Sequence, residues 1–163
     1  MLWFFFDTSA IVNRFHQEKG TEIVGTIVDS IVEGKHKGTV TPLVVLEFIS
    51  ASRRKVSTGE INWKKFKDDL ASSLEESIAS FGFLTIEARM YTEAANHVIR
   101  HGLSATDSLH LVSIGKISQT LDKSKLIVVS ADARLCDSAE KEGFRTLNPK
   151  EVTSNPVDEI LRE

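Results

Sequence analysis

The amino-acid sequence predicts one α/β domain with three layers, in which helices cover both faces of a mostly parallel central sheet. Short apolar runs alternate along the chain with longer stretches of helical periodicity, and this alternation is typical of βαβ units. The first run, residues 3–6, is an unbroken Trp-Phe-Phe-Phe, as expected of a strand that is buried on both faces. The 163 residues of the chain are the usual length of a single domain.

The expected strands are five runs rich in aromatic or β-branched residues. Thr8 or Ser9 is expected to cap the first helix, because a hydroxyl oxygen at this position accepts a hydrogen bond from a free backbone N–H. The residues after 152 are polar and are expected to form a loose helix or a tail, so the predicted domain covers residues 1–152 and the tail 153–163. The strands are expected over residues 3–6, 38–41, 81–86, 125–130 and 144–147, and the helices over 8 to about 20, 21–34, 42–55, 62–80, 87–101, 104–121 and 132–142.

The composition predicts an ordinary globular protein of the cytoplasm. Hydrophobic residues make up 41% of the chain and charged residues 26%, which excludes disordered and fibrous classes. The net charge of -3 argues against a generally basic nucleic-acid binder, although several site carboxylates would mask a local basic face. The single cysteine, Cys136, cannot form an internal disulfide, which fits a reducing compartment. The apolar run near the N-terminus is too short for a signal peptide or a membrane span.

Four acidic residues occupy similar places relative to the expected strands. Asp7 directly follows the first strand, and Asp132 lies two residues beyond the fourth. Glu47 lies in the second turn of the helix after the second strand, and Asp107 in the first turn of the helix that begins at residue 104. Because parallel strands end at one edge of their sheet, where open α/β sheets bind ligands, we expect these side chains to lie close together.

Three of these acids also have an ordinary structural explanation. Asp7 is a common residue type for a turn or a helix N-cap. Asp107 completes a capping-box pattern with Ser104. Asp132, at the start of a helix, would interact favourably with the helix dipole without any ligand. The sequence leaves both explanations open for each of the three.

Glu47 is harder to explain without a partner, because apolar residues flank it on both sides and a carboxylate in such surroundings is rarely unpaired. A salt bridge to Arg53 or Arg54 is one alternative. Two like charges 4 Å apart repel by about 4 kcal/mol at an effective dielectric of 20. Four carboxylates at one edge therefore need protons or a cation, and oxygen ligands suit Mg²⁺ or Mn²⁺. Such ions promote the hydrolysis of phosphodiesters.

Five short segments around these residues resemble the PIN-domain family, the metal-dependent ribonucleases that include VapC-like toxins. Their order and spacing match over the chain to about Val152, and the segments are Phe6–Ala10, Leu46–Phe48, Ala105–Leu111, Val128–Asp132 and Phe144–Pro149. The resemblance implies a PIN-like fold in which Mg²⁺ or Mn²⁺ is held by the catalytic acids Asp7, Glu47, Asp107 and Asp132. It also implies supporting roles for Thr8, Ser9 and Ser130.

The chain departs from the family pattern after the fourth acid. Many members carry a further acid there, whereas Asp132 is followed by Ala133 and Arg134, which argues against a fully coordinated second metal ion. The implied activity is that of an endoribonuclease that prefers single strands. A small antitoxin protein and a homodimer are left open as partners.

The basic residues on either side of the turn at Gly59 are consistent with a rim for RNA phosphates or with an ordinary solvated helix end, and the sequence leaves both explanations open. Trp63, at the start of a basic helix, is the one aromatic residue that suggests a stacking surface. His97, His101 and His110 show no metal-ligand spacing with one another, and we expect structural roles for them. The basic residues considered for the rim are Arg14, Arg53, Arg54 and Lys55.

Three other functions share part of this acidic pattern. A receiver-type domain would need adjacent acids near the first strand and a lysine after a late strand, and the chain has neither. A phosphatase with an aspartyl nucleophile would need a second acid two residues after Asp7, where Ser9 stands. The serious alternative is a PIN-like module that binds RNA or protein without cutting. Because all four acids are present, the sequence favours catalysis.

Overall fold

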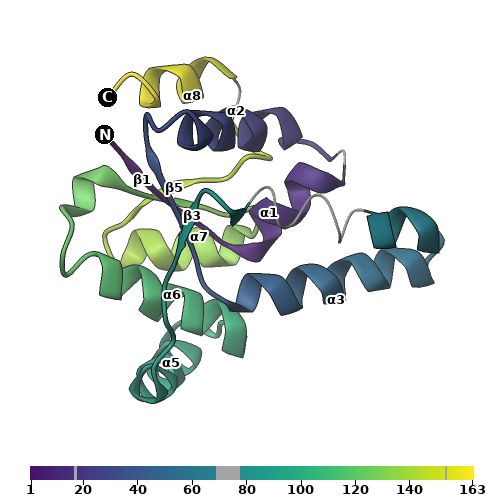
Figure 1. Ribbon diagram of the computed structural model, residues 1–163. Helices are drawn as coiled ribbons and strands as arrows, with labels where there is room; N and C mark the ends of the chain where they lie inside the picture. Colours follow the sequence, from purple (N-terminus) through teal and green to yellow (C-terminus); the bar gives the residue numbers. More distant parts are fainter. Residues whose placement is uncertain (17, 69–77, 153) are drawn as a thin grey trace.

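The computed structural model places a five-stranded sheet, parallel throughout, at the centre of the molecule (Figure 1). It describes residues 1–163 except 17, 69–77 and 153, and it leaves out the side chains of residues 154–156. The strands lie side by side in the order β3-β2-β1-β4-β5. They are β1 (Trp3–Phe6), β2 (Lys37–Val40), β3 (Phe81–Phe83), β4 (Leu126–Val129) and β5 (Arg145–Leu147).

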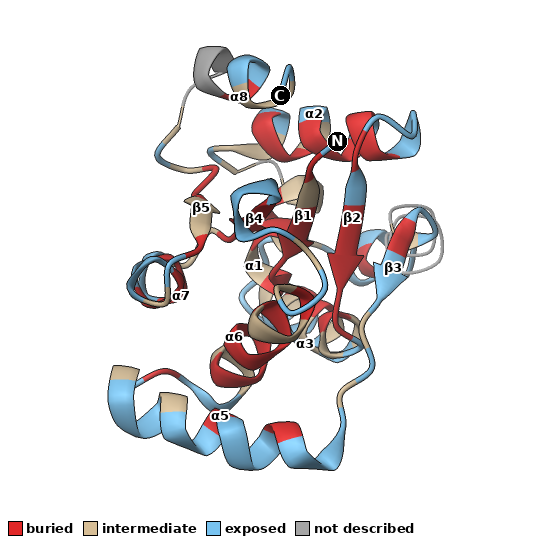
Figure 2. Cartoon of the chain, turned by 90° about the vertical axis from the view of Figure 1, so that its left-hand side faces the viewer, coloured by how far each residue is buried: buried red, intermediate tan, exposed pale blue. Residues whose placement is uncertain are grey.

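Helices cover both faces of the sheet, and alternate residues of β1 belong to the two cores. Phe4 and Phe6 pack on one side, whereas Phe5 packs on the other, because successive side chains of a strand point to opposite faces. One face is covered by α1 (Thr8–Phe15), α2 (Thr21–Val32), α3 (Leu43–Ser57) and α8 (Ser154–Ile160). The other carries α6 (Ala105–Ile117) and α7 (Ala133–Lys141), with α5 (Ala88–His101) packed outside α6 (Figure 2).

This architecture confirms the predicted three-layer fold, with differences at the ends of elements. The expected strand 81–86 ends at Phe83, and the expected helix 104–121 ends at Ile117, before a 3-10 turn at Lys123–Lys125. Of the expected helix 62–80, residues 63–68 are helical, and 69–77 lie outside the described residues. No helix in the described ranges is long and apolar enough to cross a membrane.

The strand order reverses between β1 and β4, and this reversal positions the site. The chain runs outward from β1 through β2 to β3 and then crosses back to β4 on the other side of β1. Backbone hydrogen bonds continue past the strand ends, from Asp7 N to Val129 O at 3.1 Å and from Ser130 N to Leu147 O at 3.2 Å. The segment after β1 enters α1 on one face of the sheet, whereas the segment after β4 leads to α7 on the other face. The carboxyl ends of these two strands therefore form a topological switch point, where open α/β sheets form ligand crevices.

The last helix, α8, packs against α2. Val157 is buried in the same core as the inner face of α2. The ring of His36 joins the two ends of the chain, because Leu2 N donates to its Nδ1 at 3.2 Å and its Nε2 lies 3.2 Å from Leu161 O. The C-terminal residues thus form part of one face of the molecule.

Candidate active site

The four acids predicted from the sequence line one pocket at the switch point. Asp7 follows β1 and Asp132 follows β4, while Glu47 reaches the pocket from the second turn of α3 and Asp107 from the first turn of α6. The structure therefore brings together side chains that are up to 125 positions apart in the chain. The other lining residues are Thr8, Ser9, Val12, Glu18, Ala51, Arg54 and Lys150.

Asp7 is buried and is held by two serine hydroxyls. Its Oδ2 accepts hydrogen bonds from Ser9 Oγ and, at 2.7 Å, from Ser130 Oγ. The same hydroxyl oxygens accept from the backbone after β4, since Ala131 N donates to Ser9 Oγ at 2.8 Å and Asp132 N donates to Ser130 Oγ at 3.0 Å. The two serines therefore fix the Asp7 carboxylate to the chain segment that carries Asp132.

The expectation that Thr8 or Ser9 caps α1 was wrong. Asp7 occupies the N-cap position and makes no side-chain capping bond. Both hydroxyls bind carboxylates instead, and Thr8 Oγ1 donates to Glu47 Oε2 at 2.5 Å. Helix α1 begins at Thr8, so both hydroxyls lie in its first turn and not at the N-cap. A charged acceptor makes a stronger hydrogen bond than a neutral one, which favours donation from both hydroxyls to carboxylates.

Glu47 is paired with a histidine, not with the arginines considered from the sequence. His110 Nε2 lies 3.1 Å from Glu47 Oε2. Burial tends to raise the pKa of Glu47, but the hydrogen bonds from His110 and Thr8 outweigh it and hold that pKa below its ordinary value. Glu47 is therefore an anion at neutral pH.

His110 is a site residue that the sequence interpretation missed. The ring is completely buried; its Nδ1 lies 3.3 Å from Thr41 Oγ1, and its Nε2 lies 3.7 Å from Asp7 Oδ1. Burial tends to lower the pKa of His110, but the bond to Glu47 and the charges of Asp7, Glu47 and Asp107 raise it above its ordinary value. The signal in the sequence was its position three residues after Asp107, which places both on one face of α6.

Asp107 and Asp132 are half-buried at the starts of their helices. Asp107 N donates to Ser104 Oγ at 3.1 Å, which is one half of the expected capping box, and Asp107 Oδ2 accepts from the Ser104 hydroxyl at 2.6 Å. Burial, together with the negative charges of Asp7 and Asp132, raises the pKa of Asp107. Asp132 caps α7 through Oδ1, which accepts from the amides of Arg134 and Leu135 at 2.8 and 3.3 Å. Asp107 and Asp132 therefore make hydrogen bonds expected at the start of a helix and also line the acidic pocket.

The donor set of this pocket fits a hard divalent cation. One oxygen each of Asp7, Asp107 and Asp132 is oriented by protein donors. Within the described part of the chain, the second oxygen of each accepts no hydrogen bond and is available to a ligand. No three of these four acids have ligand atoms that all lie within 4.8 Å of one another, so holding one ion with three or more of them would require side-chain movement. Carboxylate oxygens are the ligands that Mg²⁺ and Mn²⁺ prefer.

Comparison with protein families identifies this architecture. The profile of the PIN domain matches residues 4–141, which span all four acids. The chain belongs to the PIN-domain family. Proteins of this family are generally nucleases and typically bind divalent metal ions.

Solved structures show the same PIN fold at low sequence identity. PAE2754 from Pyrobaculum aerophilum is 14% identical, with a TM-score of 0.63 over 99% of this chain and 98% of its own. FitAcB from Neisseria gonorrhoeae is 17% identical, with a TM-score of 0.59 over 91% of this chain and 99% of its own. None of the curated proteins compared with the chain is similar enough to match. At these identities the structures establish the fold.

Two basic side chains line the acidic pocket of this PIN domain. Arg54, on α3, is exposed, and Lys150 lies after β5, 3.5 Å from Glu18 Oε2. Of the residues considered for a basic rim, Arg54 alone lines the pocket. Lys55 pairs with Glu18 and Glu60, Arg14 with Asp29, and Arg53 lies 5.5 Å from the ring centre of Trp63.

Proposed function

We propose that this protein is a Mg²⁺- or Mn²⁺-dependent endoribonuclease that hydrolyses RNA phosphodiester bonds in the acidic pocket. The observation that carries the proposal is the convergence of Asp7, Glu47, Asp107 and Asp132 on one crevice at the switch point of a PIN fold. Cationic Arg54 and Lys150 line the same pocket. An RNA backbone in this pocket would therefore meet both the positive charges of these two side chains and the four carboxylates.

The four carboxylates would hold the metal ion. When bound, such an ion polarises a phosphoryl oxygen and lowers the pKa of bound water, which supplies a nucleophile at neutral pH. The proposal requires the acids to be anions, and the hydrogen bonds to Glu47 favour its charged form. The raised pKa of Asp107 reflects burial and the neighbouring charges of Asp7 and Asp132, which a cation would offset.

The other residues of the pocket would orient the acids and the RNA. Ser9 and Ser130 fix Asp7, and Thr8 and His110 fix Glu47. Hydrogen bonds of this kind, made to the side chains that bind a metal, typically increase its affinity. Arg54 and Lys150 would contact the phosphate groups next to the scissile one as charge-assisted hydrogen-bond donors.

Replacement of Asp107 by Asn tests the proposal. The amide keeps the shape of the side chain but removes its charge, so we expect RNA cleavage in Mn²⁺ to fall about 100-fold or more, beyond the 10–100-fold typical of residues that only support a metal ligand. Asp137→Asn is the matched control, because Asp137 is an exposed acid on α7 outside the pocket. An Asp107→Asn protein that is folded and cleaves RNA at the wild-type rate would overturn the proposal.

We further infer that this nuclease is the toxin of a toxin–antitoxin pair. The support is the resemblance to the toxins of the PIN-domain family. Side chains on the outer face of α5 are also exposed, with Tyr91 57% and Ile99 84% accessible, and a protein partner would bury them. The test is whether the neighbouring reading frame encodes a small DNA-binding protein that co-purifies with this chain and suppresses its RNA cleavage. A neighbouring product that neither binds nor inhibits would contradict the inference.

A further inference from the structure

We propose that His97, His101 and Glu142 form a second metal site, separate from the acidic pocket, that binds Zn²⁺. Within the described residues, this is the one group of three or more His, Cys, Asp or Glu side chains whose ligand atoms all lie within 4.8 Å of one another. His97 and His101 are one turn apart on α5, and Glu142 directly follows α7. None of the three lines the acidic pocket.

The three side chains converge from two helices. His101 Nε2 lies 3.0 Å from Glu142 Oε1, and His97 Nδ1 lies 3.9 Å from the same oxygen. The expectation that these histidines lack ligand spacing was wrong, since residues four apart share one face of a helix. The two rings are stacked nearly parallel, with centres 5.5 Å apart.

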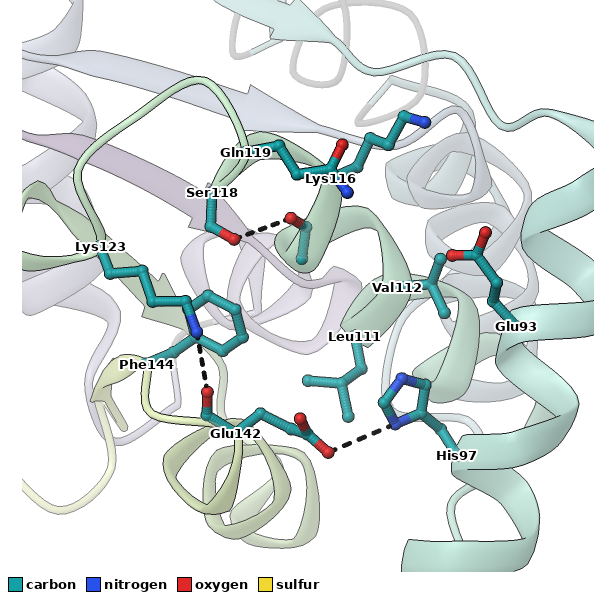
Figure 3. Close-up of a pocket in the computed structure, with 11 residues that line it drawn as sticks. Glu93, His97, Leu111, Val112, Lys116, Ser118, Gln119, Lys123, Glu142 and Phe144 are labelled. Atoms are coloured by element: carbon teal, nitrogen blue, oxygen red, sulfur yellow. Dashed lines mark hydrogen bonds and ion pairs between the residues drawn. The ribbon is translucent and has the colours of Figure 1, made fainter.

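His97 carries the observation that points most directly to a ligand. Its Nδ1 is buried and makes no hydrogen bond, and an unsatisfied buried nitrogen is costly unless something binds it. Figure 3 shows the ring facing the Glu142 carboxylate in a pocket that Glu93 also lines. Burial lowers the pKa of His97, so the ring is neutral at physiological pH, and metals bind the neutral form.

The donor atoms of this site favour a different metal ion from the one that the acidic pocket favours. Two imidazole nitrogens and one carboxylate oxygen form the set found in open zinc sites, with a further position for water or another ligand. Imidazole suits Zn²⁺, whereas Mg²⁺ prefers oxygen ligands throughout. The opposing feature is Arg100, whose Nη1 lies 3.4 Å from Glu142 Oε1 and competes with a cation for that oxygen.

A zinc ion here would tie the C-terminal ends of α5 and α7 together. The segment after His101 leads through Gly102 directly into α6, which carries Asp107. Arg134 of α7 already donates a hydrogen bond to Gly102 O. The proposed zinc site would therefore strengthen an existing link between α7 and the loop that begins the Asp107 helix, and we expect Zn²⁺ to raise the melting temperature of the full chain.

Zinc titration of the full chain in excess Mg²⁺, followed by competition with a chromophoric chelator, tests the proposal. We expect the wild type to bind one Zn²⁺ that His97→Ala, His101→Ala and Glu142→Gln each weaken by at least about tenfold. The zinc-dependent rise in melting temperature should disappear in the same variants. Circular dichroism of the metal-free proteins identifies any variant that fails to fold, and His97→Gln then replaces His97→Ala.

Two further variants separate this site from the acidic pocket. The double variant Asp7→Asn, Asp107→Asn should retain the zinc affinity of the wild type, because neither residue is a proposed ligand. Arg100→Gln should bind Zn²⁺ more tightly, since it removes the cation that competes for Glu142. Zinc binding that survives in the histidine variants, or that is lost only in the double variant, would overturn the proposal. The RNA-cleavage test of Asp107→Asn is independent of either result.

Discussion

Ser130 is a completely buried hydroxyl group that links two of the four acids. It donates to Asp7 Oδ2 at 2.7 Å and accepts from Asp132 N at 3.0 Å. Ser130→Ala would free the Asp7 carboxylate to rotate, and loss of such a supporting partner typically costs 10–100-fold in metal affinity or activity. We therefore expect RNA cleavage to fall about 10–100-fold, with a higher Mn²⁺ concentration needed for half-maximal rate.

The matched control for Ser130→Ala is Ser113→Ala. Ser113 is also completely buried, but its hydroxyl donates to Leu109 O at 2.7 Å within α6 and does not line the pocket. Its loss should leave cleavage and Mn²⁺ dependence unchanged. Equal effects of the two substitutions would show that Ser130 acts through general stability and not through Asp7.

The pKa of His110 determines how the stability of the metal-free protein is expected to depend on pH. Its pKa is raised in the folded state above the ordinary value of 6.5. The stabilising contribution is therefore fully present below about pH 6.5 and is lost as the pH rises through the raised value. We expect the free energy of unfolding in EDTA to decline from pH 6.5 upward more steeply in the wild type than in His110→Asn. Urea denaturation at a series of pH values from 6.5 upward measures the free energy of unfolding. Parallel curves for the two proteins would contradict the raised pKa of His110.

At the scale of single residues, the sequence was sufficient for side chains whose place follows from an element boundary. Asp7 and Asp132 were predictable because each follows a buried apolar strand. The partners of the Thr8 and Ser9 hydroxyls were not predictable. Thr8 binds Glu47, and Ser9 Oγ joins Asp7 to the amide of Ala131, so both depend on segments that are distant in sequence. His110 looked structural because it lies in an apolar run, and only packing shows that the run faces two acids.

At the scale of elements, the pairing of β2 with β3 depends on Gly38. A Cβ at this position would lie 2.2 Å from the ring of Phe81, which itself packs against Phe6 with ring centres 5.0 Å apart. Because the ring has little room to move, we expect Gly38→Ala to lower the free energy of unfolding by about 1–3 kcal/mol, as overpacking usually does. Urea denaturation gives the value.

Gly25→Ala in α2 is the comparison variant. A Cβ there meets no atom within 4 Å, and alanine is favoured over glycine in a helix interior by about 0.5–1 kcal/mol. The two glycine substitutions should therefore have opposite signs. A neutral or stabilising Gly38→Ala would show that the edge of the sheet can adjust to a methyl group.

Element types were easier to predict than element ends. The expected strand 81–86 is mostly apolar and still carries Leu84 and Ile86 near its end, yet pairing stops at Phe83. Beyond it Leu84 N still donates to Val40 O at 2.9 Å, after which β2 has ended and offers no further partner. The length of this edge strand is thus set by its neighbour and not by its own sequence.

At the scale of the whole molecule, the pocket is a product of topology. Its acids come from four separate segments, and they meet because the strand order reverses between β1 and β4. Alternating strands and helices predicted a parallel sheet, and therefore a shared edge for the acids. The sequence did not predict that α5 and α7 would bring His97, His101 and Glu142 together, because nothing in their local patterns indicates how these helices lie relative to each other.

The C-terminal segment provides a prediction for the whole fold. We propose that residues 1–152 are the nuclease unit and that the remainder stabilises it, since none of the described side chains of α8 lines the acidic pocket. A chain that ends at Val152 loses the buried Val157 and the contact of His36 with Leu161 O. Burial of one valine contributes about 1.5–3 kcal/mol, so we expect the free energy of unfolding to fall by at least that amount.

RNA cleavage below the melting transition should stay within about twofold of the full chain, because the truncation leaves every metal ligand and its hydrogen-bond partners in place. Removal of residues 162–163 alone is the control. It deletes the exposed ion pair of Arg145 with Glu163, and such pairs contribute about 0–1 kcal/mol. A folded chain ending at Val152 that no longer cleaves RNA would place the boundary of the nuclease unit beyond residue 152, since stability and activity would then depend on the same helix.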